Sequence, residues 1–277
     1  MSLNIKAYMM LVLASIFWAG NFIIGKFAFV ENISPFSLVF FRWLTVWFIL
    51  LPFTYKEILS KKKEILNSLP LLIFLGLASV GSFNSFVYIS LQYTQVINAA
   101  LFNTAIPAAI ILSCFIFKIE KTNFYQLLGL LISVLGILVI ITKFNLDILL
   151  NLNFNIGDIW MIGAVICWGL YSSFLKKLKL KISLLSFVHI VCSFGLIFLL
   201  PQFGYEYFQD NAATIDKTFI YCLIYLALFP SIGSYYCWAG AVSIIGANRA
   251  GIFLSLIPLF STIMAITFFK EQFQFFT

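Results

Sequence analysis

The chain has 277 residues, of which 62% are hydrophobic and only 10% are charged, and its mean hydropathy is +1.05. A soluble domain of this length needs a far more charged surface, so the composition excludes a water-soluble fold and indicates an integral membrane protein. The formal net charge is +7. The basic residues nevertheless cluster beside apolar stretches, where they interact with anionic lipid, and we expect no nucleic-acid partner.

Nine apolar stretches follow one another along the chain, and each has about the length that a helix needs to cross a bilayer. They lie near residues 7–28, 35–55, 69–91, 96–117, 124–142, 157–175, 184–201, 219–241 and 248–269. They lack the alternating pattern of a membrane barrel. The sequence therefore predicts an all-α membrane protein without a soluble domain.

Lysine and arginine predict the orientation of these spans. With a cytoplasmic N-terminus, twelve of the 17 basic residues lie in cytoplasmic segments, including the clusters at 61–63 and 176–181, and four lie in outer segments. The remaining one, Arg42, lies within a span. This bias predicts a multi-pass protein of the plasma (inner) membrane with its N-terminus in the cytoplasm.

The second half of the chain repeats the first at a shift of about 150 residues. The most informative matches are Trp18 with Trp168, Pro52 with Pro201, Pro107 with Pro258 and Glu120 with Glu271. Each repeat has five predicted spans, and five is odd, so the second copy enters the membrane in the opposite direction. We therefore predict an inverted five-plus-five repeat, with the first copy at residues 1–143 and the second at residues 155–277.

A tenth span is expected after Phe273, as the counterpart of residues 124–142, but the chain reaches only Thr277. Two interpretations stay open at this point. Either the sequence is truncated, or the protein works with nine spans and an outer C-terminus; we favour truncation.

Three motifs carry a resemblance to a known family: "FWAGNFIIGKF" (17–27), "SPFSLVFFRW" (34–43) and "AIPAAIILSCFIFKIEK" (105–121). With the glycine-spaced fifth span and the weaker second copy, the chain resembles an EamA-type member of the drug/metabolite transporter superfamily over essentially its whole length. The resemblance implies ten helices, cytoplasmic termini, and export or exchange of metabolites such as amino acids through a cavity between the repeats. The missing tenth span is the main departure from this pattern.

Polar and aromatic side chains within spans are the candidate functional residues, because they are costly in hydrocarbon unless they serve a purpose. Trp18 and Asn21 share one helix face, and Trp168 and Tyr171 repeat that spacing in the second half. The complete set of predicted substrate-binding residues is Trp18, Asn21, Asn84, Tyr88, Asn103, Trp168, Tyr171, Tyr235 and Trp238. The alternative is that the Asn and Tyr side chains bond neighbouring helices while the Trp side chains lie in the interfacial belt.

Four further residues in spans have more than one interpretation. Arg42 either reaches the outer interface or helix-end carbonyls, or it holds a substrate carboxylate or forms a gate. Pro107 and Pro258 each remove the helical donor from the carbonyl four residues earlier, so we expect kinks there, with a hinge role as the second possibility. His189, the single histidine, is expected in the core or in an interhelical bond.

The ten acidic residues are all predicted to lie in connections or at span ends. This argues against coupling through an intramembrane carboxylate and against strongly cationic substrates, and it favours neutral, zwitterionic or amphipathic solutes. We expect no catalytic residues, no metal and no cofactor, and the oligomeric state stays open. The predicted function is transport of such solutes by alternating access. The alternatives are a non-transporting remnant or assembly partner and, less favoured, a membrane-embedded enzyme.

Overall fold

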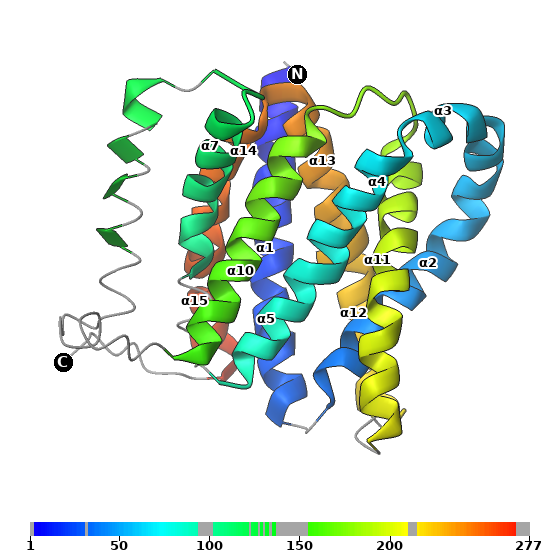
Figure 1. The fold of residues 1–277 in the computed structure, drawn as a ribbon. Coiled ribbons are helices and arrows are strands. Elements are labelled where there is room, and N and C mark those ends of the chain that lie inside the picture. Colours follow the sequence, from blue (N-terminus) through cyan, green and yellow to red (C-terminus); the bar gives the residue numbers. More distant parts are fainter. Residues whose placement is uncertain are drawn as a thin grey trace.

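The computed structural model describes residues 3–30, 33–93, 102–121, 155–209 and 215–269, together with short stretches between 123 and 136. Within these residues the chain is helical and has no strand (Figure 1). Six helical segments there are long and apolar enough to cross a membrane: Leu3–Gly25, Pro35–Ser60, Leu69–Leu91, Ile156–Leu175, Leu184–Phe208 and Lys217–Ile245. The predicted all-α architecture is confirmed for this part of the chain.

The first half contains two long helices, an interrupted rod and a shorter helix. They are α1 (Leu3–Val30), α2 (Pro35–Ser60) and α3 (Lys62–Asn67); a rod made of α4 (Leu69–Gly76), a first π segment (Leu77–Phe83) and α5 (Asn84–Leu91); and a 3-10 turn (Asn103–Ala105) leading into α7 (Ile106–Ile116). The predicted span at 124–142 lies largely outside the described residues.

The second half has the same order of elements. They are α10 (Ile156–Leu175) and α11 (Leu184–Phe208); a rod made of α12 (Lys217–Leu226), a second π segment (Ala227–Gly233) and α13 (Ser234–Ile245); and α14 (Ala247–Gly251), a 3-10 turn (Ile252–Ser255) and α15 (Leu256–Phe269). The two π segments are 150 residues apart. The predicted tenth span lies outside the described residues.

Two predicted spans are too short. Helices α2 and α11 continue past Pro52 and Pro201 to Ser60 and Phe208, whereas the sequence placed their ends near 55 and 201. A proline within a membrane helix bends it without necessarily ending it. The longer α11 has one consequence for the site, because it places Glu206 within a helix and leaves its side chain only 8% exposed.

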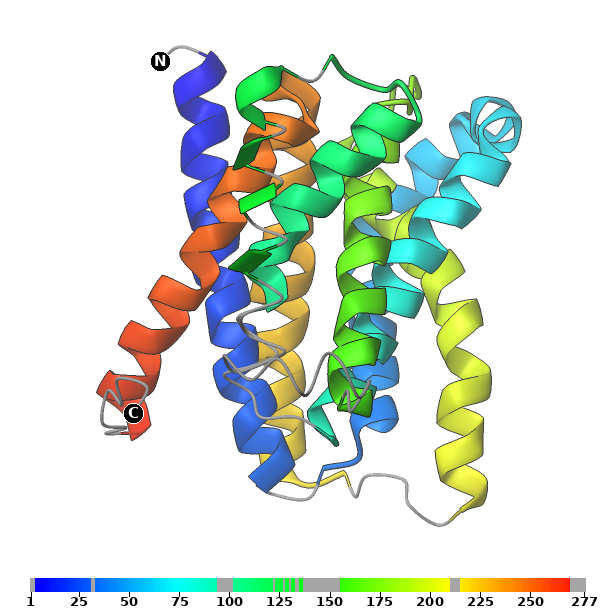
Figure 2. The same ribbon diagram turned by 60° about the vertical axis from the view of Figure 1, so that its left-hand side comes forward.

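The first helix of each half packs against the other half. Helix α1 contacts α13 and α15, whereas α10 contacts α5 and α7. Helices α2 and α11 pack against each other and run antiparallel, because the start of each lies beside the end of the other. Figure 1 shows α2 with α11 along one side of the bundle, and Figure 2 shows α1 at the opposite edge, beside α15. The two halves therefore interlock rather than forming separate units.

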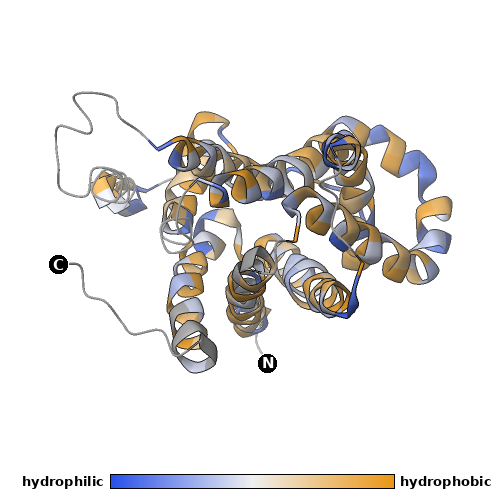
Figure 3. Cartoon of the chain, turned by 90° about the horizontal axis from the view of Figure 1, so that it is seen from below, coloured by the Kyte–Doolittle hydropathy of each residue, from blue (hydrophilic) through white to orange (hydrophobic). Residues whose placement is uncertain are grey.

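The outer surface of the bundle is apolar. Large exposed side chains include Phe48 and Phe53 on α2 and Ile197 and Leu200 on α11. Hydrophobic residues predominate along the helices when the bundle is viewed along its axis, with hydrophilic residues between them (Figure 3). An apolar surface of this extent fits lipid contact and would be a liability in water.

Candidate functional site

A small pocket, which we call the central pocket, lies among helices of both halves and has a volume of about 40 Å³. Its lining comes from α1, the first rod, the start of α7, α10, and the region where α15 begins: Trp18, Asn21, Phe22, Phe83, Asn84, Val87, Tyr88, Asn103, Ile106, Trp168, Leu254 and Ile257. This volume holds one or a few water molecules. A metabolite fits only if the surrounding side chains move apart.

The structure places six of the nine predicted binding residues in this lining. The other three, Tyr171, Tyr235 and Trp238, lie beside it in an aromatic cluster. Ring centroids are 5.2 Å apart for Trp18 and Trp168, 5.6 Å for Trp18 and Trp238, and 5.5 Å for Trp168 and Tyr235. These Trp side chains are buried within the bundle, so the interfacial-belt alternative does not describe them.

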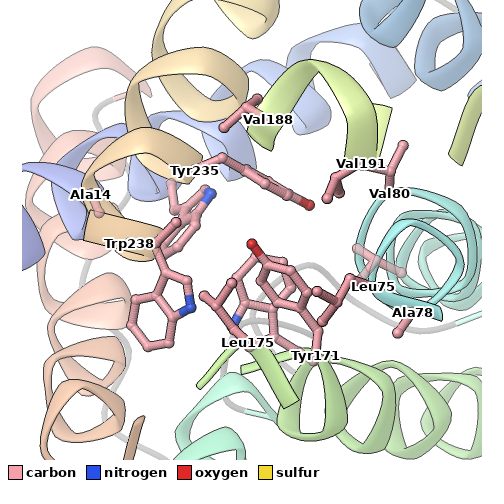
Figure 4. Packing of buried hydrophobic residues seen from close by; sticks show 14 of the residues in the cluster. Ala14, Leu75, Ala78, Val80, Tyr171, Leu175, Val188, Val191, Tyr235 and Trp238 are labelled. Atoms are coloured by element: carbon pink, nitrogen blue, oxygen red, sulfur yellow. The ribbon is translucent and has the colours of Figure 1, made fainter. Parts of the chain in front are cut away.

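The aromatic cluster contains polar atoms without partners. Figure 4 shows the hydroxyl groups of Tyr171 and Tyr235 directed toward the same space between the helices. Neither hydroxyl, nor the indole N–H of Trp238, has a hydrogen-bond partner among the described residues. A buried polar group without a partner costs about 1–3 kcal/mol. The cluster is therefore suited to water or a polar ligand.

Trp18 and Trp168 match each other in the repeat but differ in their bonding. Trp18 Nε1 donates to the carbonyl of Pro230 in the second π segment at 3.1 Å. Trp168 Nε1 is buried and has no partner among the described residues. The carbonyl that would match Pro230 belongs to Val80, and it accepts from Asn84 Nδ2 at 3.1 Å. Asn84 thus occupies this acceptor and leaves a pocket-lining indole N–H free.

Some polar residues of the first half form hydrogen bonds within the bundle, and others lie in the pocket lining without a partner among the described residues. Asn84 Nδ2 also donates to the carbonyl of Ser79, so this amide stabilises its own π segment rather than a neighbouring helix. In contrast, Tyr88 Oη and Asn103 Oδ1 are buried in the pocket lining without a partner among the described residues. Asn103 and Tyr88 therefore remain candidates for ligand contact.

The carbonyl of Asn103 is satisfied in an unexpected way. Pro107 removes its α-helical donor, as the sequence indicates, but the 3-10 turn lets Ile106 N–H donate to it instead. A second 3-10 turn, Ile252–Ser255, precedes Pro258 in the matching position. Both prolines therefore lie just after a 3-10 turn, where the helix changes its winding. Whether Pro107 and Pro258 act as hinges stays a prediction.

Arg42 lies in the core and is only 2% exposed. Its Nε donates to Ser231 Oγ at 2.6 Å, and its Nη1 donates to Asn21 Oδ1 at 2.9 Å. The Trp43 ring lies 5.3 Å from its Cζ. The expectation that Arg42 reaches the interface or helix-end carbonyls is wrong, because the side chain turns inward to a serine and to the pocket-lining amide of Asn21.

A larger pocket, which we call the vestibule, adjoins the central pocket and has a volume of about 440 Å³. The ends of α1, α5 and α11 and the start of α2 line it, through Gly25, Ala28, Ile33, Ser34, Pro35, Phe36, Leu38, Tyr88, Leu91, Gln92, Tyr205 and Glu206. Gln92 and Tyr205 are exposed, so the vestibule reaches the surface of the protein. Tyr88 lines both pockets.

Glu206 lines the vestibule and was not among the predicted site residues. Its carboxylate accepts from the backbone N–H groups of Phe36 and Ser37 and from the hydroxyls of Ser34 and Ser37. The signal that could have found it is the repeat itself. Glu57 and Glu206 are 149 residues apart, the shift that relates the serines of the same spans.

His189 lies in the core, as expected, between α2 and α11. Its Nδ1 contacts Thr54 Oγ1, and its ring packs edge-on against Trp47 at 5.4 Å. Trp47 Nε1 donates to Ser193 Oγ, which donates to the His189 carbonyl. This interhelical network lies apart from both pockets.

Among the described residues no group of three or more His, Cys, Asp or Glu side chains is placed to hold a metal ion. The five cysteines are buried or half-buried, and no disulfide joins them within the described residues.

Comparison with known proteins agrees with this arrangement. The model of the EamA-like transporter family matches residues 5–142 and 155–277. The chain belongs to this family. The two matched segments coincide closely with the two halves described above.

Individual relatives of this EamA protein are transporters by name. An uncharacterized transporter of Archaeoglobus fulgidus is 28% identical over 99% of this chain and 93% of that protein. The uncharacterized transporter YyaM of Bacillus subtilis is 26% identical over 95% of this chain and 86% of its own length. An Escherichia coli protein named "Probable amino-acid metabolite efflux pump" is 24% identical over 94% of this chain and 86% of its own length. The family and these names point to a multi-pass membrane transporter of small molecules.

Proposed function

We propose that this EamA protein transports small neutral, zwitterionic or amphipathic metabolites, such as amino acids, out of the cell or by exchange. The observation that carries this proposal is the pair of adjoining pockets in the bundle core, with a vestibule that reaches the surface and a constricted central pocket beyond it. A carrier that alternates between two open states requires such a one-sided opening. The name of the Escherichia coli relative supports amino acids as the substrate class.

Alternating access would arise from an inverted five-plus-five repeat, with units at 1–143 and 155–277. The 150-residue spacing of the π segments supports this repeat, and so does the reciprocal packing of α1 and α10 against the opposite halves. Exchange of slightly different conformations between two such halves would close the vestibule and open the opposite end.

The proposed binding residues are those of the central pocket and its aromatic cluster: Trp18, Asn21, Asn84, Tyr88, Asn103, Trp168, Tyr171, Tyr235 and Trp238. Aromatic walls supply contact area, and a few amides and hydroxyls orient the solute. Pro107 and Pro258 would be the hinges. With the proposed cytoplasmic N-terminus in the inner membrane, the vestibule faces the outside.

The test is export of a panel of amino acids from cells that express Trp18→Ala or Asn21→Leu. We expect both variants to lower efflux about tenfold or more per molecule of protein in the membrane, the loss that accompanies removal of a central contact in a small site. Trp160→Ala is the matched control, because Trp160 packs on Phe86 outside both pockets. Unchanged efflux in both test variants would overturn the assignment of the pocket.

A further inference from the structure

The buried guanidinium of Arg42 has no acidic partner. Among the described residues no carboxylate lies within 4 Å of it, and its hydrogen bonds go to the neutral acceptors Ser231 Oγ and Asn21 Oδ1. The Ser231 hydroxyl already donates to the carbonyl of Leu226, so it acts toward the guanidinium as an acceptor. A buried charge with only neutral partners is costly, and proteins that retain one commonly use it.

The guanidinium also keeps unused donors. A guanidinium carries five N–H groups, and the bonds to Ser231 and Asn21 account for two of them. The other N–H groups have no hydrogen-bond partner among the described residues. A planar fork of free donors of this kind matches a carboxylate, which accepts two parallel hydrogen bonds.

Arg42 lines neither pocket itself, but it bonds Asn21, which lies in the lining of the central pocket. Gly25 and Leu38 line the vestibule, and Asn21 and Arg42 follow them one helical turn deeper on α1 and α2. Asn21 itself lines the central pocket. A solute that passes from the vestibule to the central pocket therefore meets the Asn21–Arg42 pair.

The surroundings of Arg42 are rich in unsatisfied donors. The indole N–H groups of Trp43, Trp168 and Trp238 are buried without partners among the described residues. Trp43 packs on Tyr235 at 5.0 Å, which connects Arg42 to the aromatic cluster. An anionic group fits these donors, and the aromatic faces fit an apolar body attached to it.

We propose that Arg42 forms an anion subsite that binds the carboxylate of the transported solute. As the solute enters, Asn21 either keeps its hydrogen bond to the guanidinium beside the solute or gives it up. This proposal rests on the proposed transport function and narrows its substrates to carboxylates with an apolar body. The body would lie against Trp18 and Trp168.

The test measures binding to the purified full chain by tryptophan fluorescence. The probes are two acids and their neutral amides, 3-phenylpropionate with 3-phenylpropionamide and N-acetylleucine with N-acetylleucinamide, and chloride serves as a free anion. We expect the wild-type protein to prefer each acid over its amide. Arg42→Gln should lower the affinity for the acids about tenfold or more, the loss expected for a charged hydrogen bond, and leave the amides unchanged.

Two variants control this test. Arg249→Gln removes the other arginine of the chain, which is exposed on α14, and should keep the preference for acids. Asn21→Asp changes the shape little and places a fixed carboxylate on Arg42, so it should abolish the preference even if Arg42→Gln does not fold.

Equal binding of acids and amides by the wild-type protein, or no binding of the acids, overturns the anion subsite. A response to chloride alone assigns the guanidinium to a free anion and likewise overturns the proposal. Export that still depends on Trp18 in those cases leaves the transport function standing. Export that is independent of Trp18 and Asn21 overturns the assignment of the pocket, and absence of export by the wild-type protein overturns the transport function itself.

Discussion

Glu57 and Glu206 cap each other's helices from opposite ends of the α2–α11 pair. Glu206, near the end of α11, accepts from Ser37 N–H at 2.8 Å at the start of α2. Glu57, near the end of α2, accepts from Ser183 N–H at 2.8 Å just before α11 begins. A carboxylate at a helix N-terminus satisfies otherwise unpaired N–H groups and interacts favourably with the helix dipole. These two caps therefore link α2 to α11 at both ends of the antiparallel pair.

Removal of the Glu206 carboxylate should destabilise the protein more than removal of the Glu57 carboxylate. Glu206 is 8% exposed, so Glu206→Ala removes the carboxylate that accepts from the N–H groups of Phe36 and Ser37 in a largely buried place. We expect a loss of about 1–3 kcal/mol, the usual cost of buried unsatisfied groups. Glu57→Ala leaves the N–H of the exposed Ser183 accessible to water and should cost about 1 kcal/mol or less. Thermal unfolding of the purified variants in detergent measures the difference.

Glu64→Ala is the control for this comparison, since Glu64 bonds only the exposed Lys61 side chain. It should unfold at the wild-type temperature, because an exposed ion pair contributes little. Equal losses for Glu206→Ala and Glu64→Ala would contradict the capping role of Glu206.

A close crossing between the first rod and α11 depends on Gly195. A Cβ at this position would lie 2.2 Å from Val80 Cγ1 and 3.3 Å from the carbonyl oxygen of Gly76. Small residues allow such close approach of membrane helices. Gly195→Ala should therefore lower the free energy of unfolding by about 1–3 kcal/mol, as overpacking does.

Two further variants separate this steric effect from helix propensity. Gly204→Ala, on the same helix, has open space around its Cβ and should leave stability unchanged or raise it by up to about 1 kcal/mol. The double variant Gly195→Ala with Val80→Gly should recover part of the loss, because glycine removes both Val80 Cγ1 and Val80 Cβ, which would lie 2.2 and 2.3 Å from the added methyl group. Failure of the double variant to recover stability would argue for a different cause.

The helical architecture could be predicted from the sequence because hydropathy over a bilayer length determines it, and the described spans lie close to the predicted ones. The repeat also indicated that Trp18 and Trp168 belong together, and the structure packs their rings against each other. Local patterns such as these depend on residue type and spacing alone, which a sequence displays directly.

The missed features depend on partners that are distant in the sequence. The inward turn of Arg42 depends on Ser231, which is 189 residues away, and the burial of Glu206 depends on Ser37, which is 169 residues away. The π segments gave no hydropathy signal, because adding one residue to a turn leaves the composition unchanged. The constriction of the central pocket is a matter of packing and has no signature in any single span.

The matching tryptophans should respond differently to loss of their indole N–H. Trp18→Phe removes the donor to the Pro230 carbonyl and should destabilise the protein by about 1–2 kcal/mol. Trp168→Phe removes a donor without a partner among the described residues, so stability should change little while solute binding weakens. Thermal unfolding and export, measured on the same two variants, check both halves of this prediction. Loss of stability in Trp168→Phe but not in Trp18→Phe would contradict this assignment of the two indole N–H groups.

The side of the membrane that the vestibule faces follows from the position of the end of α11. Phe208 is 83% exposed there, two residues from the vestibule-lining Glu206, and Lys62 is exposed at the opposite end of the α2–α11 pair. In a chain whose five cysteines are replaced by alanine, Phe208→Cys should react with an impermeant thiol reagent on intact cells. Lys62→Cys should react only after the cells are opened, because the basic cluster at 61–63 holds that end in the cytoplasm. Labelling of Lys62→Cys but not Phe208→Cys on intact cells would reverse the topology and turn the vestibule toward the cytoplasm.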